Sequence, residues 1–241
     1  MTGSFVPNCG DFFRIEHENY TLISSLLAII AVDMVFSKLF RRFLAAPKED
    51  NMKYLIAGLG NPGEKYAHTR HNAGFLVLDE LAEKYNAEWS SKRYAWQAQT
   101  KYRGKQLVLI KPNTFMNLSG KAVRYWMTKE KVPLKNVLIV VDDLHIPFRS
   151  IRIKGKGSDA GHNGLKDIQQ QLGTSNYSRL RIGIGSEFSK GRQIDYVLGE
   201  WSEEEKQALS TIWKTSVEAI ESFIHRGLAP TMNEFNRRVI E

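Results

Sequence analysis

Residues 69–78, TRHNAGFLVL, mark the point where a polar loop becomes a helix. The basic and polar run at 69–72 stops, and an apolar pattern with helical spacing begins at once, continuing to about Tyr85. The sequence therefore predicts a helix over 73–85. His71 lies at the junction between loop and helix, where a rigid element can hold its imidazole in a fixed direction.

A glycine-rich turn precedes this junction. Residues 58–63, GLGNPG, follow the strand-like run 53–57 and satisfy the G-x-G-x-x-G pattern of dinucleotide-binding folds. In those folds the helix opens within the glycine run, so that its N-terminus meets the pyrophosphate. Here the apolar pattern begins only near Ala73, so we disfavour a nucleotide site. The turn instead predicts that Asn61 lies at the carboxyl end of a strand, where α/β proteins place their sites.

Strand and helix patterns alternate along the rest of the chain. Strands are predicted at 54–57, 94–102, 106–110, 137–141, 151–154 and 180–184, and helices at 73–85, 119–126, 164–172 and 203–226. This alternation indicates an α/β fold, a mixed sheet covered by helices on both faces.

The charge is unevenly distributed along the 241 residues. The formal net charge is +8; residues 1–51 hold five Lys/Arg and six Asp/Glu, a net of −1, so residues 52–241 carry +9. Such an excess favours a polyanionic partner. Cys9 is the only cysteine, which excludes an internal disulfide or a cysteine-based metal site and fits a reducing, cytoplasmic location.

Residues 1–51 are predicted to be a helical or disordered extension that ends in a linker, followed by a single globular domain at 52–241. The apolar segment at 20–42 is interrupted by Asp33, which is costly in a membrane span. Three interpretations stay open. The extension is read from a start codon placed too early, with Met52 the actual start; or it lies on a membrane or folds against the domain; or it anchors the domain to a membrane. We disfavour membrane contact.

An acidic residue is predicted to lie close to His71. Asp142 directly follows the strand at 137–141, so its carboxylate lies at another strand's carboxyl end. There it can accept a hydrogen bond from one imidazole nitrogen and leave the other free to take a proton from water. The alternative is a metal site, but no ligand-spaced motif such as H-E-x-x-H occurs, and we predict neither metal nor cofactor. Its candidate ligands are His68, His71, Asp142, Asp143, His145 and His162.

Four motifs resemble those of the bacterial-type peptidyl-tRNA hydrolases, in the same order, from about Met52 to the C-terminus. They are GLGNPG at 58–63, TRHNAG at 69–74, TFMNLSG at 114–120 and GHNGLKD at 161–167. The resemblance implies a single α/β domain around a twisted mixed sheet. It also implies hydrolysis of the ester between peptide and tRNA, which recycles tRNA from aborted translation.

The resemblance also implies residue roles. His71 would activate water, and Asp142 would orient it. Asn61, Asn117 and Asn163 would bind the peptide and the scissile ester, since an amide offers both a donor and an acceptor. Tyr66 and Met116 would line the same cleft.

Basic residues near the last motif are predicted to bind tRNA phosphates. Arg152 and Lys154 lie on one predicted strand, and Arg179 and Arg181 alternate on another, so that the latter two project to one face. Family members carry phosphate-binding residues at the positions of Lys154 and Arg181. The loop at 155–161 departs from the family's glycine-rich pattern, because Lys156, Ser158, Asp159 and Ala160 replace part of it.

The expected partner is therefore peptidyl-tRNA, and the expected state is a monomer. Two alternatives remain: a non-catalytic RNA-binding protein on the same fold, and a general esterase. An RNA-binding protein would need neither His71 with Asp142 nor the three asparagines. The basic charge disfavours a general esterase.

Overall fold

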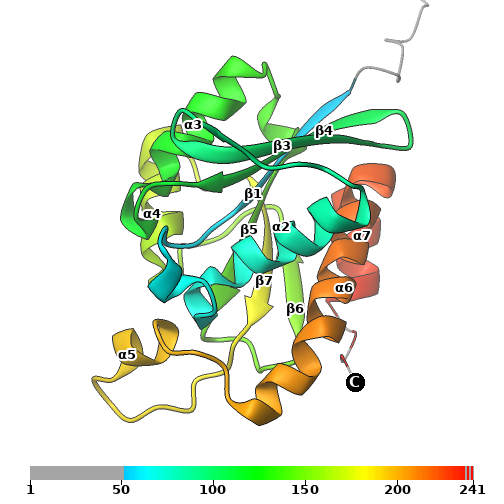
Figure 1. Ribbon diagram of the computed structural model, residues 1–241. Coiled ribbons are helices and arrows are strands. Elements are labelled where there is room, and N and C mark those ends of the chain that lie inside the picture. The colour runs from blue at the N-terminus through cyan, green and yellow to red at the C-terminus, as the bar shows by residue number, and fades with distance from the viewer. Residues whose placement is uncertain (1–51, 237, 239, 241) are drawn as a thin grey trace, which may run out of the picture. The chain divides into compact units, whose positions relative to one another are not determined.

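A seven-stranded mixed sheet forms the centre of the computed structural model, which describes residues 52–236, 238 and 240 (Figure 1). The strand order is β2-β3-β4-β1-β5-β7-β6. The four inner strands β4, β1, β5 and β7 are parallel, whereas β2, β3 and β6 pair antiparallel with their neighbours. The strands are β1 Lys53–Gly58, β2 Ser90–Lys92, β3 Ala95–Tyr102, β4 Lys105–Pro112, β5 Val137–Asp143, β6 Ile151–Lys154 and β7 Ser178–Gly183.

Helices cover both faces of this sheet, which confirms the predicted fold class (Figure 1). One face is covered by α2 Ala73–Lys84, α6 Glu203–Arg226 and α7 Leu228–Phe235, and the other by α3 Ser119–Lys129 and α4 Asn163–Leu172. The short α5 Gln193–Val197 buries none of its residues. Single 3-10 turns are η2 Glu64–Tyr66, η3 Arg70–Asn72, η4 Met116–Leu118 and η5 Leu134–Asn136.

The central strands are apolar on both faces because each face is buried under helices. On β5, Leu138 and Val140 belong to the core beneath α2 and α6, whereas Ile139 and Val141 belong to the core beneath α3 and α4. This is the two-residue period of a strand. It explains why β1, β4 and β5 contain continuous hydrophobic runs rather than alternating patterns.

Two glycines let α2 pack directly against the carboxyl ends of the strands. A Cβ atom at Gly58 would lie 2.2 Å from the carbonyl oxygen of Gly74, and one at Gly74 would lie 2.4 Å from the carbonyl oxygen of Val140. The glycine run does not open a helix, since η2 and η3 intervene before α2 begins at Ala73. The arrangement differs from a dinucleotide-binding turn and brings η3 to the end of β5.

Within the described residues, no helix is both long and apolar enough to cross a membrane. The predicted extension at 1–51, with its apolar segment at 20–42, lies outside the described residues. The boundary between residues 51 and 52 stays a prediction.

Candidate functional site

Three side chains from separate elements meet at the carboxyl ends of the central strands. His71 lies on η3, Asp142 lies near the end of β5, and His162 directly precedes α4. His71 Nδ1 lies 3.1 Å from Asp142 Oδ1 and 3.0 Å from Oδ2. His162 Nε2 lies 3.1 Å from Oδ1. One buried carboxylate therefore holds two imidazoles.

The hydrogen bonds of His162 determine which of its nitrogens carries the proton. Its Nδ1 accepts from the backbone N–H groups of Gly164 (3.1 Å) and Leu165 (3.4 Å), so this nitrogen presents a lone pair. The imidazole thus caps α4, a position more often taken by a short polar side chain. The proton is consequently on Nε2, which donates to Asp142.

His71 uses only one of its two nitrogens. A carboxylate accepts hydrogen bonds and does not donate them, so Nδ1–H of His71 donates to Asp142. Nε2 has no hydrogen-bond partner among the described residues, and the side chain is 12% exposed. His71 therefore presents an unprotonated nitrogen that water can reach, as a general base requires.

Burial and the ion pair shift the pKa values of both groups. Burial lowers the pKa of His71, but the charge of Asp142 and its hydrogen bond raise it by more, so the net shift is upward. Burial raises the pKa of the Asp142 carboxyl, but interactions with His71 and His162 lower it by more. Asp142 therefore stays ionised, and His71 is a stronger base than an ordinary histidine.

Asn61 is fixed by three hydrogen bonds that tie neighbouring loops together. Its Oδ1 accepts from the backbone N–H of Met116 (2.8 Å). Its backbone N–H donates to Asn72 Oδ1 (2.8 Å), and Asn72 Nδ2 donates to its carbonyl (3.0 Å). The Nδ2 group of Asn61 has no partner in the described part of the chain. A donor at a defined position is thus available to a ligand.

The other predicted substrate residues lie around these loops. Met116 is buried beside Gly164, and a Cβ atom at Gly164 would lie 2.7 Å from its sulfur. Asn117 on η4 and Asn163, the first residue of α4, are exposed. Tyr66 on η2 is half-buried.

Two hollows divide the predicted substrate residues. A cavity of about 90 Å³ is lined by His71, Asp142, His162 and Asn163, with Ile194 and Val197 of α5 among the other lining residues. A second hollow of about 470 Å³ contains Asn61 beside Phe75, Trp89 and Trp96. Tyr66, Met116 and Asn117 line neither of them. Asn61 and Met116 are brought together by their hydrogen bond.

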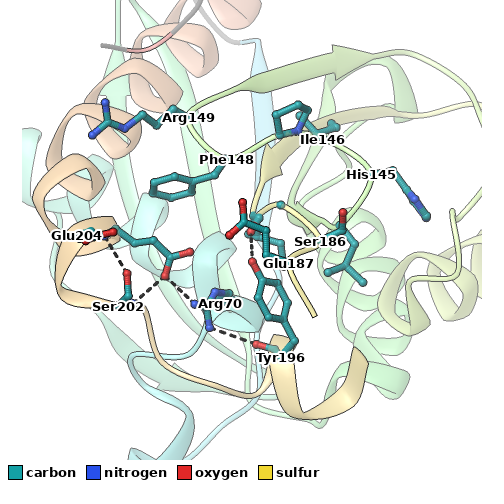
Figure 2. A pocket seen from close by; sticks show the side chains of 15 residues that line it. Arg70, His145, Ile146, Phe148, Arg149, Ser186, Glu187, Tyr196, Ser202 and Glu204 are labelled. Atoms are coloured by element: carbon teal, nitrogen blue, oxygen red, sulfur yellow. Dashed lines mark hydrogen bonds and ion pairs between the residues drawn. The ribbon is translucent and has the colours of Figure 1, made fainter. Parts of the chain in front are cut away.

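Arg70 connects the loop that carries His71 to the C-terminal part of the chain. Its guanidinium pairs with Glu205 (2.6 Å), donates to the carbonyl of Glu200 (2.7 Å) and lies 4.4 Å from the Tyr196 ring centroid. Figure 2 shows Arg70 between Tyr196 and the start of α6, in a pocket of about 850 Å³. Tyr196 in turn donates from its hydroxyl to the carbonyl of Ile184 (2.6 Å). These contacts hold α5 beside the His71 cavity.

The four predicted phosphate-binding residues share one face of β6 and β7. Arg152 is directly opposite Arg181, and Lys154 is directly opposite Arg179. Arg152 and Lys154 are exposed, but Arg179 and Arg181 are buried.

The burial of Arg179 and Arg181 differs from the expectation for phosphate ligands. Arg181 pairs with Asp143 (2.7 Å) and donates to the carbonyl of Ser158 (2.7 Å). Arg179 donates to the carbonyl of Ser175 (2.8 Å) and stacks 4.0 Å above the Tyr177 ring. Ser158 of the 155–161 loop contacts Arg181, and residues 175–177 contact Arg179. Both arginines are therefore buried beneath these segments and do not lie on the protein surface.

Among the described residues, one group of side chains is close enough to bind a metal ion, and it consists of the same three residues. One ligand atom each from His71, Asp142 and His162 lies within 4.8 Å of the others. Asp143, of the predicted cluster, instead pairs with Arg181. From the sequence, His162 was predicted only as a candidate ligand of that cluster. Its position two residues before the helix predicted at 164–172 was the signal for its capping role.

Comparisons with known proteins agree with one another. A family model described as peptidyl-tRNA hydrolase matches residues 55–241. A peptidyl-tRNA hydrolase of Phocaeicola vulgatus is 55% identical over 187 residues, which are 78% of this chain and all of that protein. One from Porphyromonas gingivalis is 52% identical over 185 residues, 77% of this chain and all of that protein. A crystal structure of peptidyl-tRNA hydrolase from Acinetobacter baumannii is 32% identical, with a TM-score of 0.74, and covers 82% of this chain and 100% of its own.

Proposed function

Since the chain belongs to the peptidyl-tRNA hydrolase family, we propose that it cleaves the ester between peptide and tRNA with His71 as general base. The observation that carries the proposal is the His71–Asp142 pair. Nδ1 is held by a buried carboxylate, and Nε2 has no partner among the described residues. An RNA-binding protein without activity would not need a base prepared in this way.

The reaction proceeds through addition of water to the ester carbonyl. Nε2 of His71 accepts a proton from water as the water oxygen bonds to the carbonyl carbon, and the carbonyl electron pair moves to oxygen. When the carbon–oxygen bond to the ribose breaks, the imidazolium returns the proton to the leaving oxygen. The products are a free peptide carboxyl group and tRNA with a free hydroxyl. Asp142 stabilises the imidazolium between the two steps.

Asn61 is proposed to stabilise the negative oxygen of the tetrahedral intermediate. Its Oδ1 is occupied by Met116 N–H, so its Nδ2 group is the part available to substrate. A donor held in this way needs no reorganisation during the reaction, and losing one typically lowers kcat by about 10²–10³. Asn117 and Asn163 are exposed and are proposed to bind the peptide and the ester. Tyr66 and Met116 line neither hollow, and they are proposed to border the substrate once it is bound.

The tRNA part is proposed to bind across β6 and β7. Arg152 and Lys154 are exposed and free to meet phosphates, and each phosphate contact adds about 0.7–0.9 to the salt dependence of binding. For Arg179 and Arg181, a direct contact requires the 155–161 loop to open, since both are buried. Until it opens, Arg181 holds that loop through the carbonyl of Ser158, and Arg179 donates to the carbonyl of Ser175.

We also propose that the protein is a cytoplasmic monomer that needs no metal or cofactor. Cys9 as the only cysteine is consistent with a reducing compartment. The positions of the protons support independence from metal. His71 Nδ1 and His162 Nε2 both donate to Asp142, and His162 Nδ1 accepts from the backbone N–H of Gly164, so none of these three nitrogens has a free lone pair for a metal ion.

Incubation with purified N-acetylated aminoacyl-tRNA tests the proposal. The protein should release free tRNA and N-acetyl amino acid in equal amounts. Binding without release would favour the RNA-binding alternative. Equally fast cleavage of a short N-acetyl amino acid ester that lacks the tRNA would favour a general esterase.

A further inference from the structure

A long segment of the chain is basic without a single acidic residue. Between Glu88 and Glu130, residues 89–129 contain nine Lys/Arg, at 92, 93, 101, 103, 105, 111, 121, 124 and 129, and no Asp/Glu. The predicted phosphate-binding residues at 152–154 and 179–181 lie outside it. This segment therefore carries positive charge that the proposed tRNA site does not use.

Five of these cations gather on one surface, which we call the α3 surface. Lys92 and Arg93 lie at the turn between β2 and β3, and Lys121, Arg124 and Lys129 lie on α3. Arg124 follows Lys121 by three residues and so lies beside it on the helix, and Lys129 lies 5.8 Å from the Tyr125 ring centroid. All five are exposed, and within residues 52–236 none has a carboxylate within ion-pair distance.

Two tyrosine rings lie among these cations. The rings of Tyr94 and Tyr125 meet edge to face, with centroids 5.4 Å apart. Arg93 lies 5.0 Å from the first ring and 5.3 Å from the second, and Lys121 lies 4.9 Å from the Tyr94 ring. Half-buried aromatic rings among unpaired cations offer phosphate contacts together with base stacking, the combination that single-stranded nucleic acids require.

The surface is held rigid from below. Trp126 Nε1 donates to the carbonyl of Arg93 (3.1 Å), which fixes the β2–β3 turn on α3. The backbone N–H of Asn113 donates to the carbonyl of Tyr94 (3.1 Å). Tyr94 has a φ of 66°, a left-handed conformation that costs energy in a bulky residue. The turn therefore holds its rings and cations in place before any ligand binds.

The α3 surface adjoins η4, which carries Asn117, and is separate from Arg152 and Lys154 on β6. Lys121 follows Asn117 by four residues, about one helical turn. In the strand order, β2 and β3 lie at one edge of the sheet and β6 lies at the other (Figure 1). A substrate ester in the cleft thus has basic surfaces on two sides.

We propose that the α3 surface binds the sugar-phosphate backbone of the tRNA part of the substrate, as a second contact besides Arg152 and Lys154. The proposal rests on the proposed function, because that function supplies the tRNA. Aromatic rings between the cations favour RNA over an acidic protein, which would need only the charges.

The test removes two cations without changing the helix. Lys121→Ala with Arg124→Ala keeps α3 intact, because alanine is a strong helix former. The matched control, Lys101→Ala with Lys214→Ala, removes the same charge from exposed positions elsewhere. Affinity for deacylated tRNA is measured by fluorescence anisotropy over a series of salt concentrations.

The expected result is a smaller salt dependence in the test variant alone. Two lost phosphate contacts flatten the slope of log affinity against log salt by up to about 1.4–1.8. If the two proteins bind equally at 1 M salt, a slope change of about 1.6 makes the variant bind roughly 40-fold more weakly than the unmodified protein at 0.1 M salt. Hydrolysis of an N-acetyl amino acid ester of adenosine should be unchanged, since this substrate lacks the tRNA body.

Three outcomes decide between the possibilities. An unchanged slope, or the same change in the control, overturns the α3 surface as an RNA site. A loss of adenosine-ester hydrolysis overturns it as well, because the variant then damages the cleft. The binding assay is independent of catalysis. If the protein hydrolyses neither substrate but loses salt-dependent tRNA binding in the test variant, the proposed function is contradicted and the α3 surface is supported as an RNA-binding site.

Discussion

Replacing Asp142 by asparagine should nearly abolish hydrolysis, although the change barely alters the size of the side chain. His162 can only donate towards position 142, because its Nδ1 accepts from Gly164 and Leu165. In Asp142→Asn the new amide oxygen must therefore face His162. The new NH₂ group then takes the position of Oδ2, 3.0 Å from His71 Nδ1, while the amide oxygen takes the position of Oδ1, 3.1 Å from both His71 Nδ1 and His162 Nε2.

This exchange reverses the tautomer of His71. An Nδ1–H group would meet the NH₂ group at 3.0 Å, so we expect Nδ1 to accept from the NH₂ group instead. The proton then moves to Nε2, and the nitrogen that should take a proton from water no longer can. A positioned base contributes about 10²–10⁴ in rate, and the corresponding change in serine proteases costs about 10⁴ in kcat. We expect a loss within that range, with the melting temperature little changed.

The assay is single-turnover release of tRNA from N-acetylated aminoacyl-tRNA, and a second variant tests the reasoning. His162→Ser keeps a side chain suited to capping α4 but is too short to bond to residue 142. In the double variant, the amide is free to turn its oxygen to His71, which restores the working tautomer. Asp142→Asn with His162→Ser should therefore be more active than Asp142→Asn alone. If the double variant is no faster, while His162→Ser alone is active, the tautomer argument is wrong.

Three further predictions concern pH, salt and metal. First, kcat/KM should fall as the pH drops through the pKa of His71, because the protonated ring cannot accept a proton from water. Burial lowers this pKa, but Asp142 raises it by more. A value of kcat/KM that does not change between about pH 5 and 8 would contradict this. Second, Arg152→Ala with Lys154→Ala should flatten the salt slope of tRNA binding by up to about 1.4–1.8 and spare kcat; a loss of kcat with an unchanged slope would exclude the phosphate contacts. Third, dialysis against a chelator should leave hydrolysis unchanged, and activity lost and then restored by zinc would make the three-residue cluster a metal site.

Periodicity predicted the main elements because these pack on one another. Residues 203–226 were predicted as a helix, and α6 has those bounds, with a capping box at Ser202 and Glu205 and an end at Gly227. By contrast, α5 buries none of its residues and so leaves no apolar pattern in the sequence. It is held by Tyr196 and Arg70, and long-range contacts of this kind cannot be read from local spacing.

The candidate site was predictable where topology alone brings residues together. Parallel strands end at one edge, so Asp142 and the loop of His71 were expected to be close, and the structure brings them within 3.0 Å. The alternation of Arg179 and Arg181 predicted their shared face, but it gave no information on what covers β7. His162 was placed only among metal candidates, because an imidazole is an uncommon helix cap.

The central claim is that Nε2 of His71 takes the proton from water. Its most direct test is the single-turnover rate of His71→Ala on N-acetylated aminoacyl-tRNA, with tRNA affinity measured in parallel. The rate should fall by about 10²–10⁴, while affinity and melting temperature stay close to those of the unmodified protein. A variant that binds tRNA normally and still releases it at the original rate would remove His71 from the mechanism.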